Sequence, residues 1–308
     1  MKKSFLLIFF GVLFFTAGCD KIDNPYKQVS SIDLDTSLYP GNWDDYLENE
    51  YPVFSNNTNT NVNVLIEDYT GHKCNNCPPA AILAENIANN NPGRVFVASI
   101  HASPGETFSF QSVNEGGNKY YTDHTNDDGR AYGKAFENGF NFWGNPQGTI
   151  NRKTVNGELF AFTGTWDTRT TNILSENNLK VNIQSVFNYF ESTTGGFLHV
   201  EFEKLSNESL DLNAVVYVIQ DSLVDWQKMQ DNSDNEFYVH KDKHLGSIDG
   251  NPWGMPVFNA ESSAGDKIIL DYSYKLPQNI EKENLHFLIY VYDTDTYEIL
   301  HVIKQKIE

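Results

Sequence analysis

The segment "NVNVLIEDYTGHKCNNCPPA", residues 61–80, decides the fold of the first half of the chain. Its β-branched apolar run, which ends at Tyr69, predicts a buried strand. Two prolines then begin a helical pattern, because the first N–H groups of a helix lack partners and tolerate proline. The pattern ends at Asn91-Pro92-Gly93, and "RVFVASIHA", residues 94–102, predicts a second buried strand. Together these segments predict a parallel βαβ unit.

Two of the three cysteines in the chain, Cys74 and Cys77, lie where this strand turns into the helix. A disulfide between them would stabilise the fold by about 2 kcal/mol, against about 4.7 kcal/mol for a loop of about 100 residues. Unpaired amide groups and the helix dipole lower the pKa of a thiol at this position. We therefore expect a redox pair, with Cys74 as the outer, less covered nucleophile and Cys77 as the resolving thiol. The adjacent Lys73 adds a positive charge that favours the thiolate.

The amino terminus has the layout of a secretory signal, with Lys2-Lys3, an apolar run and then "TAGC". The apolar run is shorter than the roughly 20 residues that a membrane helix needs. "TAGC" resembles the bacterial lipobox, whose cysteine receives lipid. We therefore expect residues 1–18 to be removed and Cys19 to carry acyl chains such as palmitate, with an ordinary signal peptide and a free Cys19 as the alternative. Residues 19–60, polar and rich in asparagine, are expected to form a lipid-anchored spacer, with packing of about residues 43–54 on the first domain as the alternative for that part.

The chain of 308 residues contains 41 acidic and 22 basic side chains, which gives a formal net charge of −19. Removal of residues 1–18, which hold Lys2 and Lys3, leaves 41 acids against 20 bases, or −21. Such a surface repels nucleic acid and anionic lipid, so a nucleic-acid-binding function is excluded. The 40% of hydrophobic and 14% of aromatic residues are typical of a globular protein.

Two further residues make the βαβ unit resemble the thioredoxin superfamily. Asp68 lies six positions before Cys74, the spacing of the buried carboxylate that in thioredoxins helps to move the proton of the resolving cysteine. Pro146 precedes an extended run, as does the cis proline that faces the disulfide in that superfamily. The resemblance implies a Cys74–Cys77 disulfide and catalytic roles for both cysteines, Asp68 and Pro146. An Asp68 that points into solvent or caps a turn is the alternative.

The segment after Pro146 is predicted to complete this fold. Residues 149–155 and 158–162 are extended runs around Asn156-Gly157, the strongest short signal of a hairpin. A helix over about 165–177 follows. The chain before Pro146 is longer than a minimal thioredoxin needs, with an insertion over about residues 103–128. The aromatic residues that follow the insertion are expected to fill the core, with a substrate groove as the alternative: Tyr132, Phe136, Phe140, Phe142 and Trp143.

Four segments, "EDYTGHKCNNCPPAA", "SIHA", "NPQGTINR" and "YVHKDKH", resemble the lipoprotein family of Gram-negative bacteria named after outer membrane protein twenty-eight. The resemblance implies an α/β thioredoxin-like domain, residues 61–179, followed by an all-β immunoglobulin-like sandwich domain, residues 180–308. It also implies a lipid anchor in the outer membrane. Lys73, Asn75-Asn76 and Asn145 depart from the thioredoxin pattern, so the direction of the redox reaction stays open.

The second half alternates extended segments with turns and predicts an antiparallel sandwich. The segments are residues 180–190, 195–205, 211–220, 266–276, 284–293 and 297–307. "LHVEFEK" alternates cleanly, which predicts one face in water. Residues 238–258, with His240, His244 and Trp253, are expected to form a loop over one end of the sandwich, with ligand binding as the alternative.

Two histidines raise a metal alternative for the cysteine pair. His72 lies two residues before Cys74, and His101 ends the neighbouring strand, so both are expected at the same edge of the sheet. Two thiolates and two imidazoles would suit Zn²⁺ or copper. Otherwise His72 and His101 serve the fold or tune the thiolate.

These observations favour a thiol–disulfide oxidoreductase that acts on exported proteins and needs no cofactor. Two other classes stay open. One is a non-catalytic binding or adhesion lipoprotein with a structural disulfide and a surface protein as partner. The other is a zinc- or copper-binding protein.

Overall fold

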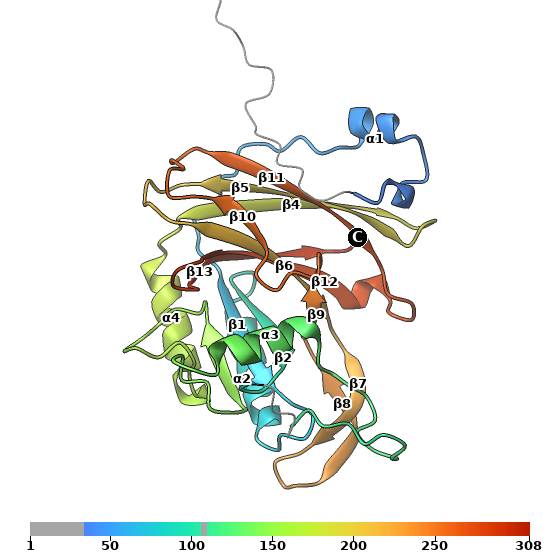
Figure 1. The fold of residues 1–308 in the computed structure, drawn as a ribbon, viewed down its shortest axis with the longest axis vertical. Helices are drawn as coiled ribbons and strands as arrows, with labels where there is room; N and C mark the ends of the chain where they lie inside the picture. The colour runs from blue at the N-terminus through green and yellow to red at the C-terminus, as the bar shows by residue number, and fades with distance from the viewer. Residues whose placement is uncertain (1–33, 106–109) are drawn as a thin grey trace, which may run out of the picture.

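The computed structural model describes residues 34–105 and 110–308. The predicted signal peptide, Cys19 and the first part of the predicted spacer lie outside these residues. The described chain is a mixed α/β protein, mostly sheet with a few helices (Figure 1). None of the helices in the two described ranges is long and apolar enough to cross a membrane.

The helices of the described ranges are α1 (Trp43–Asn49), α2 (Cys77–Asn90), α3 (Asp127–Phe136) and α4 (Trp166–Glu176), with the 3-10 turns η1 (Thr36–Leu38), η2 (Thr163–Thr165) and η3 (Lys282–Asn284). The strands before α4 are β1 (Val64–Thr70), β2 (Val95–His101) and β3 (Gln147–Ile150). Those after it are β4 (Val181–Phe190), β5 (Gly195–Lys204), β6 (Leu212–Gln220), β7 (Leu223–Lys228), β8 (Asp234–His240), β9 (Lys243–Ser247), β10 (Met255–Phe258), β11 (Lys267–Lys275), β12 (Leu285–Asp293) and β13 (Ile299–Lys306).

The strands β1 and β2 are parallel neighbours, and α2 connects them. Thr70 at the end of β1 lies beside His101 at the end of β2, so both carboxyl ends reach the same edge of the sheet. The predicted parallel unit is therefore confirmed. β3 runs antiparallel to β1 and places Gly148 beside Asp68.

The strand β9 joins this unit to the second half in one sheet. The strand order is β13-β12-β6-β9-β2-β1-β3, with β10 paired to β6. β9 is antiparallel to β6 and parallel to β2, where Lys243 lies beside Ser99. One sheet therefore contains strands from both sides of residue 179, where we expected the first domain to end.

A second sheet, of order β11-β5-β4, packs over the β6–β12 part of the large sheet. The apolar core between the two layers includes Val200, Phe202, Val216, Leu270 and Phe287. The strands predicted from residue 180 onward thus form two packed layers. The predicted loop over residues 238–258 instead contains β9, β10 and part of β8.

The helix α1 covers the outer face of β5. Its Tyr46 is fully buried against Phe197, and the Tyr46 hydroxyl lies 2.5 Å from Nε2 of His199. Phe197 and His199 of β5 are therefore buried on the face that we predicted to be in water. That prediction was wrong, because a segment expected to be a spacer packs there.

The prediction of an extended run over residues 149–155 is also wrong. β3 ends at Ile150, because Asn151 and Arg152 adopt left-handed φ angles of 48° and 47° and turn the chain. The tight turn at Asn156-Gly157 does form, with Val155 and Glu158 exchanging two backbone hydrogen bonds of 3.0 Å.

Most of the aromatic residues between residues 130 and 143 fill the core, as expected. Tyr132, Phe136 and Phe142 are at most 1% exposed, and their cluster reaches Tyr217 and Tyr290 of the second half. Trp143, by contrast, is 68% exposed.

Candidate functional site

A disulfide joins Cys74 and Cys77 in the turn between β1 and α2. Each cysteine is only 1% exposed. The expectation that Cys74 is the less covered of the two is therefore wrong. Two segments that sequence reasoning did not place near the cysteines cover the turn.

The strand β7 forms one side of this cover. The side chain of Gln227, itself 2% exposed, donates hydrogen bonds to the carbonyl oxygens of Cys74 (3.0 Å) and Gly71 (3.4 Å). The backbone N–H of Lys228 donates to the carbonyl of His72 at 2.8 Å. Hydrogen bonds to the carbonyl groups of Gly71, His72 and Cys74 thus join the cysteine turn to the β7–β8 hairpin.

Residues 110–114 of the insertion form the other side. Gln111 donates to the carbonyl of Thr70 at 2.6 Å, and Ser112 O lies 3.1 Å from Nε2 of His72. The ammonium group of Lys73 donates to the side chains of Ser112 and Asn114, both at 3.0 Å. The Lys73 side chain therefore points toward the insertion, where these two oxygen atoms solvate its ammonium group.

The start of α2 offers fewer amide donors than we expected from the sequence. α2 begins at Cys77, and the next two residues are Pro78 and Pro79, which have no N–H. The N–H of Cys77 bonds to Cys74 O at 3.3 Å. A thiolate at Cys74 would therefore be stabilised mainly by the helix dipole and by few direct donors.

Asp68 is fully buried on β1, and neither of its carboxyl oxygens has a hydrogen-bond partner within the described residues. Burial raises the pKa of Asp68 to about 7. The alternative that Asp68 points into solvent is thereby excluded. A carboxyl that titrates near neutral pH in an apolar site is suited to accept and return a proton.

Pro146 directly precedes β3 and is joined to Asn145 by a cis peptide bond. The Asn145 side chain donates to Ala102 O at 2.7 Å and to Thr70 O at 3.5 Å. The proline loop is thereby tied to the ends of β1 and β2, at the edge of the sheet where the cysteine turn begins.

His72 and His101 are both buried at this edge, 1% and 2% exposed. Two histidines that the sequence analysis did not assign to the site, His124 and His240, lie with them. The alternative metal set of His72, His101 and two thiolates would need the reduced cysteines, whereas the two sulfur atoms are bonded to each other in this structure. The segment "YVHKDKH" contained His240, but its place beside the cysteines depends on how β7 and β8 fold back.

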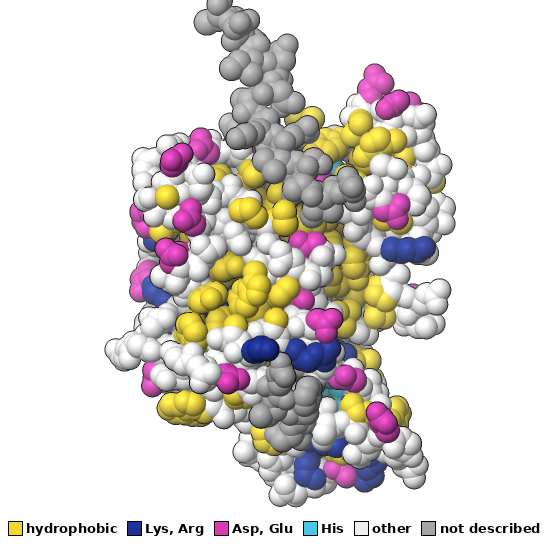
Figure 2. Space-filling view, in the orientation of Figure 1, with side chains coloured by type: hydrophobic (Ala, Val, Ile, Leu, Met, Phe, Trp, Pro, Cys, Tyr) yellow, Lys and Arg dark blue, Asp and Glu magenta, His cyan; other side chains and the backbone are white. Residues whose placement is uncertain are grey.

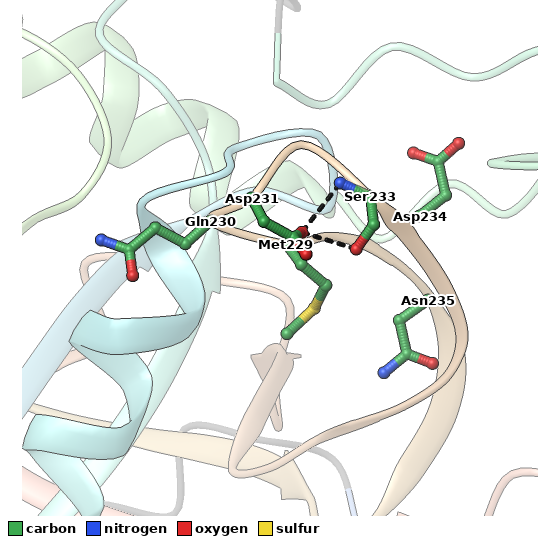
Figure 3. Close-up of a pocket in the computed structure, with 6 residues that line it drawn as sticks. All are labelled: Met229, Gln230, Asp231, Ser233, Asp234 and Asn235. Carbon is green, nitrogen blue, oxygen red and sulfur yellow. Dashed lines mark hydrogen bonds between the residues drawn. The ribbon is translucent and has the colours of Figure 1, made fainter.

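The β7–β8 hairpin is fastened to the insertion by an ionic contact. Asp234 accepts hydrogen bonds from Lys119 (2.8 Å) and from the Tyr120 hydroxyl (2.6 Å), and Lys228 lies 3.5 Å away. Figure 2 shows basic and acidic side chains side by side at this end of the molecule. The turn of the hairpin also carries an open hollow lined by residues 229–231 and 233–235 (Figure 3).

Replacing Asp234 by alanine is expected to make the disulfide easier to reach. The lost bonds are partly exposed and contribute about 1 kcal/mol, so opening of the hairpin should become about fivefold more frequent. The rate at which a water-soluble phosphine reduces the disulfide measures this. Asp231→Ala is the matched control, because Asp231 accepts hydrogen bonds from Ser233 in its own turn (Figure 3). Equal rates in the two variants would contradict the role of Asp234.

The comparisons with known proteins bear on both the family and the fold. The family model "Outer membrane protein Omp28" matches residues 133–308, more than half of the chain. No curated protein matches. HBP35 of Porphyromonas gingivalis has a similar structure, with a TM-score of 0.60 and 13% identity over 80% of this chain and 76% of that one. At this identity the likeness shows the fold alone.

A solved domain of the outer membrane lipoprotein Omp28 from Porphyromonas gingivalis also matches. Its identity is 22% over 42% of this chain and 89% of that one, with a TM-score of 0.29. The family model, which covers more than half of the chain, shows that the chain belongs to the Omp28 family and is located at the outer membrane.

Proposed function

We propose that this outer-membrane protein is a thiol–disulfide oxidoreductase that acts on exported proteins through Cys74 and Cys77. The observation that carries the proposal is a disulfide at the start of α2 together with a buried carboxyl, Asp68, on the strand that leads into it, which has no hydrogen-bond partner among residues 34–105 and 110–308. A disulfide that closes so short a loop contributes little to stability. Burial of a carboxyl without a hydrogen-bond partner costs free energy, and carboxyls whose pKa is shifted in this way cluster at functional sites.

The arrangement of the first half supports this proposal. Two parallel strands around α2, an antiparallel β3 that begins after a cis proline, and α4 are similar to a thioredoxin-like domain over residues 61–179. Residues 180–308 would then be an immunoglobulin-like sandwich that positions this domain. Lipid on Cys19 would hold both at the membrane.

The exchange we propose begins with a substrate disulfide and the reduced protein. The Cys74 thiolate attacks one substrate sulfur, a mixed disulfide forms, and the other substrate sulfur leaves as a thiolate. Asp68 accepts the proton of the Cys77 thiol. The Cys77 thiolate then attacks Cys74, which releases the second substrate sulfur and restores the Cys74–Cys77 disulfide. The same steps in reverse oxidise a substrate dithiol.

Substrate access requires the cover to open. Both cysteines are buried in a turn that is bonded to β7 and to residues 110–114, so a substrate protein reaches Cys74 only after the hairpin moves. We propose that substrate binding and hairpin opening occur together.

Trapping of the mixed disulfide tests the proposed function. In Cys77→Ser the second step is blocked, so substrates should remain bonded to Cys74 and appear as adducts that dithiothreitol releases. Cys74→Ser is the control and should trap few proteins, because it lacks the attacking sulfur. The absence of adducts from Cys77→Ser, together with no exchange by the wild type on a test disulfide, would refute the enzyme.

A second candidate is a binding lipoprotein in which the disulfide is only structural. The 1% exposure of both cysteines favours it. In that case, loss of both cysteines would leave partner binding intact, whereas the oxidoreductase would lose its function.

A further inference from the structure

Exposed apolar side chains gather on the β7–β8 hairpin and on α2, beside the disulfide. Eleven large hydrophobic side chains are exposed in residues 34–105 and 110–308, and four of them belong to these elements. The four are between 42% and 73% exposed: Val224 of β7, Phe237 and Val239 of β8, and Ile82 of α2. A concentration of exposed apolar side chains is typical of a surface that binds another molecule.

The ladder of the hairpin brings two of these side chains together. Val224 is paired with Val239, so the two lie side by side on one face. Tyr238 belongs to the opposite face and lines a cavity of about 20 Å³ beside Cys77. Phe237 lies where the ladder shifts its register, and it is the most exposed of the four. The hairpin therefore covers the cysteine turn with one face and presents apolar side chains to solvent with the other.

A hollow of about 210 Å³ lies between the hairpin and α2. Ala81 and Ile82 line it from α2, and Tyr238 and Val239 line it from β8. Its volume is sufficient for one large apolar side chain. Ala81 and Tyr238 also line the smaller cavity beside Cys77, so the two spaces adjoin. A side chain held in the hollow would therefore lie next to the cysteine turn.

The backbone of β8 is also available to a partner. β7 and β8 form a two-stranded sheet, and no other strand of residues 34–105 and 110–308 pairs with β8. The N–H and C=O groups along the free edge of a strand can bond to an extended chain that is added to the sheet. An extended peptide segment with a large apolar side chain thus fits both the edge and the hollow.

The charges beside the hollow favour a basic segment. Glu85 and Lys241 form an ion pair and offset each other. Asp242 also lines the hollow, and burial raises its pKa only to about 6, so its carboxylate is ionised at neutral pH. Glu236 on β8 is exposed. The remaining charge is negative, so a lysine or arginine beside the apolar residue would be attracted and an acidic residue repelled.

We propose that the outer face of the hairpin and the hollow bind an extended segment of an exported substrate protein, with a large apolar residue in the hollow and a basic residue beside Asp242. This inference rests on the proposed function, because it names the substrate of the cysteine pair. Chains expose such apolar segments before they fold, so the substrates are incompletely folded proteins. A segment bound between β8 and α2 also contacts the hairpin, the element that has to move before exchange.

Peptide binding to the oxidised full-length wild type tests the surface without thiol exchange, because the peptides contain no cysteine. One extended peptide has Lys-Leu-Phe-Lys at its centre, and the other has Asp-Ser-Ser-Asp. We expect the first to bind at least about 10-fold more tightly by calorimetry, since it buries apolar area in the hollow. Ile82→Ser and Val239→Ser should each weaken its binding about fivefold or more. Val53→Ser is the matched control, because Val53 is exposed but lies outside the hairpin and α2.

Exchange kinetics connect this surface to the cysteine pair. For a substrate disulfide placed next to the Lys-Leu-Phe-Lys segment, Ile82→Ser should raise KM about fivefold and leave kcat within about twofold, because the lost contact holds the substrate and not the reacting atoms. A change in kcat alone would contradict a binding role for Ile82.

Two results of the binding experiment would overturn the proposal. The first is equal affinity of the oxidised wild type for the two peptides, a result that does not depend on whether any variant folds. The second is unchanged affinity in Ile82→Ser and Val239→Ser. Thiol exchange that shows no preference between the two segments would refute this surface and leave the enzyme standing. Selective peptide binding without exchange on any test disulfide would count against the proposed function alone.

Discussion

Replacement of Arg152 by methionine is expected to lower the free energy of unfolding by about 3–5 kcal/mol, because it leaves a buried charge without its partner. Arg152 and Glu67 are both fully buried, and two hydrogen bonds of 2.7 and 2.8 Å join them. Burial alone would raise the pKa of Glu67, but the Arg152 charge and its hydrogen bonds outweigh burial and lower it. Glu67 thus remains ionised in the core and depends on Arg152.

This ion pair also connects the two halves of the chain. Arg152 donates to the hydroxyls of Tyr217 (2.9 Å) and Tyr290 (3.2 Å), which come from β6 and β12. Since the partners of Glu67 and Arg152 come from both halves, the variant should destabilise both together. Chemical denaturation followed by fluorescence and by circular dichroism should therefore give one coincident transition at lower denaturant.

Lys153→Met is the matched control for this prediction. Lys153 also pairs with a glutamate, Glu176, but both side chains are partly exposed. Such a pair contributes about 0–1 kcal/mol. A loss below about 1 kcal/mol in Arg152→Met, or separate transitions for the two halves, would contradict the structural role of the pair.

Replacement of Asp68 by asparagine is expected to stabilise the protein at alkaline pH and to remove a pH dependence. The pKa of Asp68 rises from 3.8 to about 7 in the folded state because of burial. The folded protein therefore holds this proton more tightly than the unfolded chain. Asp68 therefore contributes about 4 kcal/mol to the free energy of unfolding below about pH 4. This contribution is lost as the pH rises through about 7.

The variant lacks this titration, so above pH 8 it should be more stable than the wild type by up to about 4 kcal/mol. Denaturation at pH 5 and pH 8 measures the change, and Asp231→Asn, at an exposed site, should leave the wild-type pH dependence in place. If Asp68 also moves the proton of Cys77, the variant should slow thiol exchange by about 100-fold or more. Equal pH dependence in Asp68→Asn and wild type would show that Asp68 does not titrate as stated.

The sequence predicted the elements whose signals are local. The apolar run before Tyr69, the prolines at the start of α2 and the turn at Asn156-Gly157 each depend on neighbouring residues, and each is found as expected. Asp68 was placed on β1 by its spacing from Cys74, and its burial follows from the position of β1 inside the sheet. These parts needed no knowledge of distant contacts.

The other parts of the fold and of the candidate site depend on contacts between segments that are far apart in the sequence. Gln227 and His240 belong to a hairpin that covers the cysteine turn more than 150 residues away, and polar strands such as β7 and β8 give a weak pattern. The left-handed turn at Asn151 and Arg152 interrupts a run that reads as extended, because Arg152 turns inward to Glu67. The cover of β5 by α1 likewise depends on Tyr46 meeting His199.

The central claim is that the start of α2 makes a sulfur atom reactive once the hairpin opens. The pH dependence of Cys74 alkylation by iodoacetamide, in reduced and folded Cys77→Ser, tests it most directly. We predict a Cys74 pKa well below the ~8.5 of a free cysteine, and alkylation much faster than global unfolding. A pKa near ~8.5, or alkylation that occurs only at the rate of unfolding, would contradict the claim.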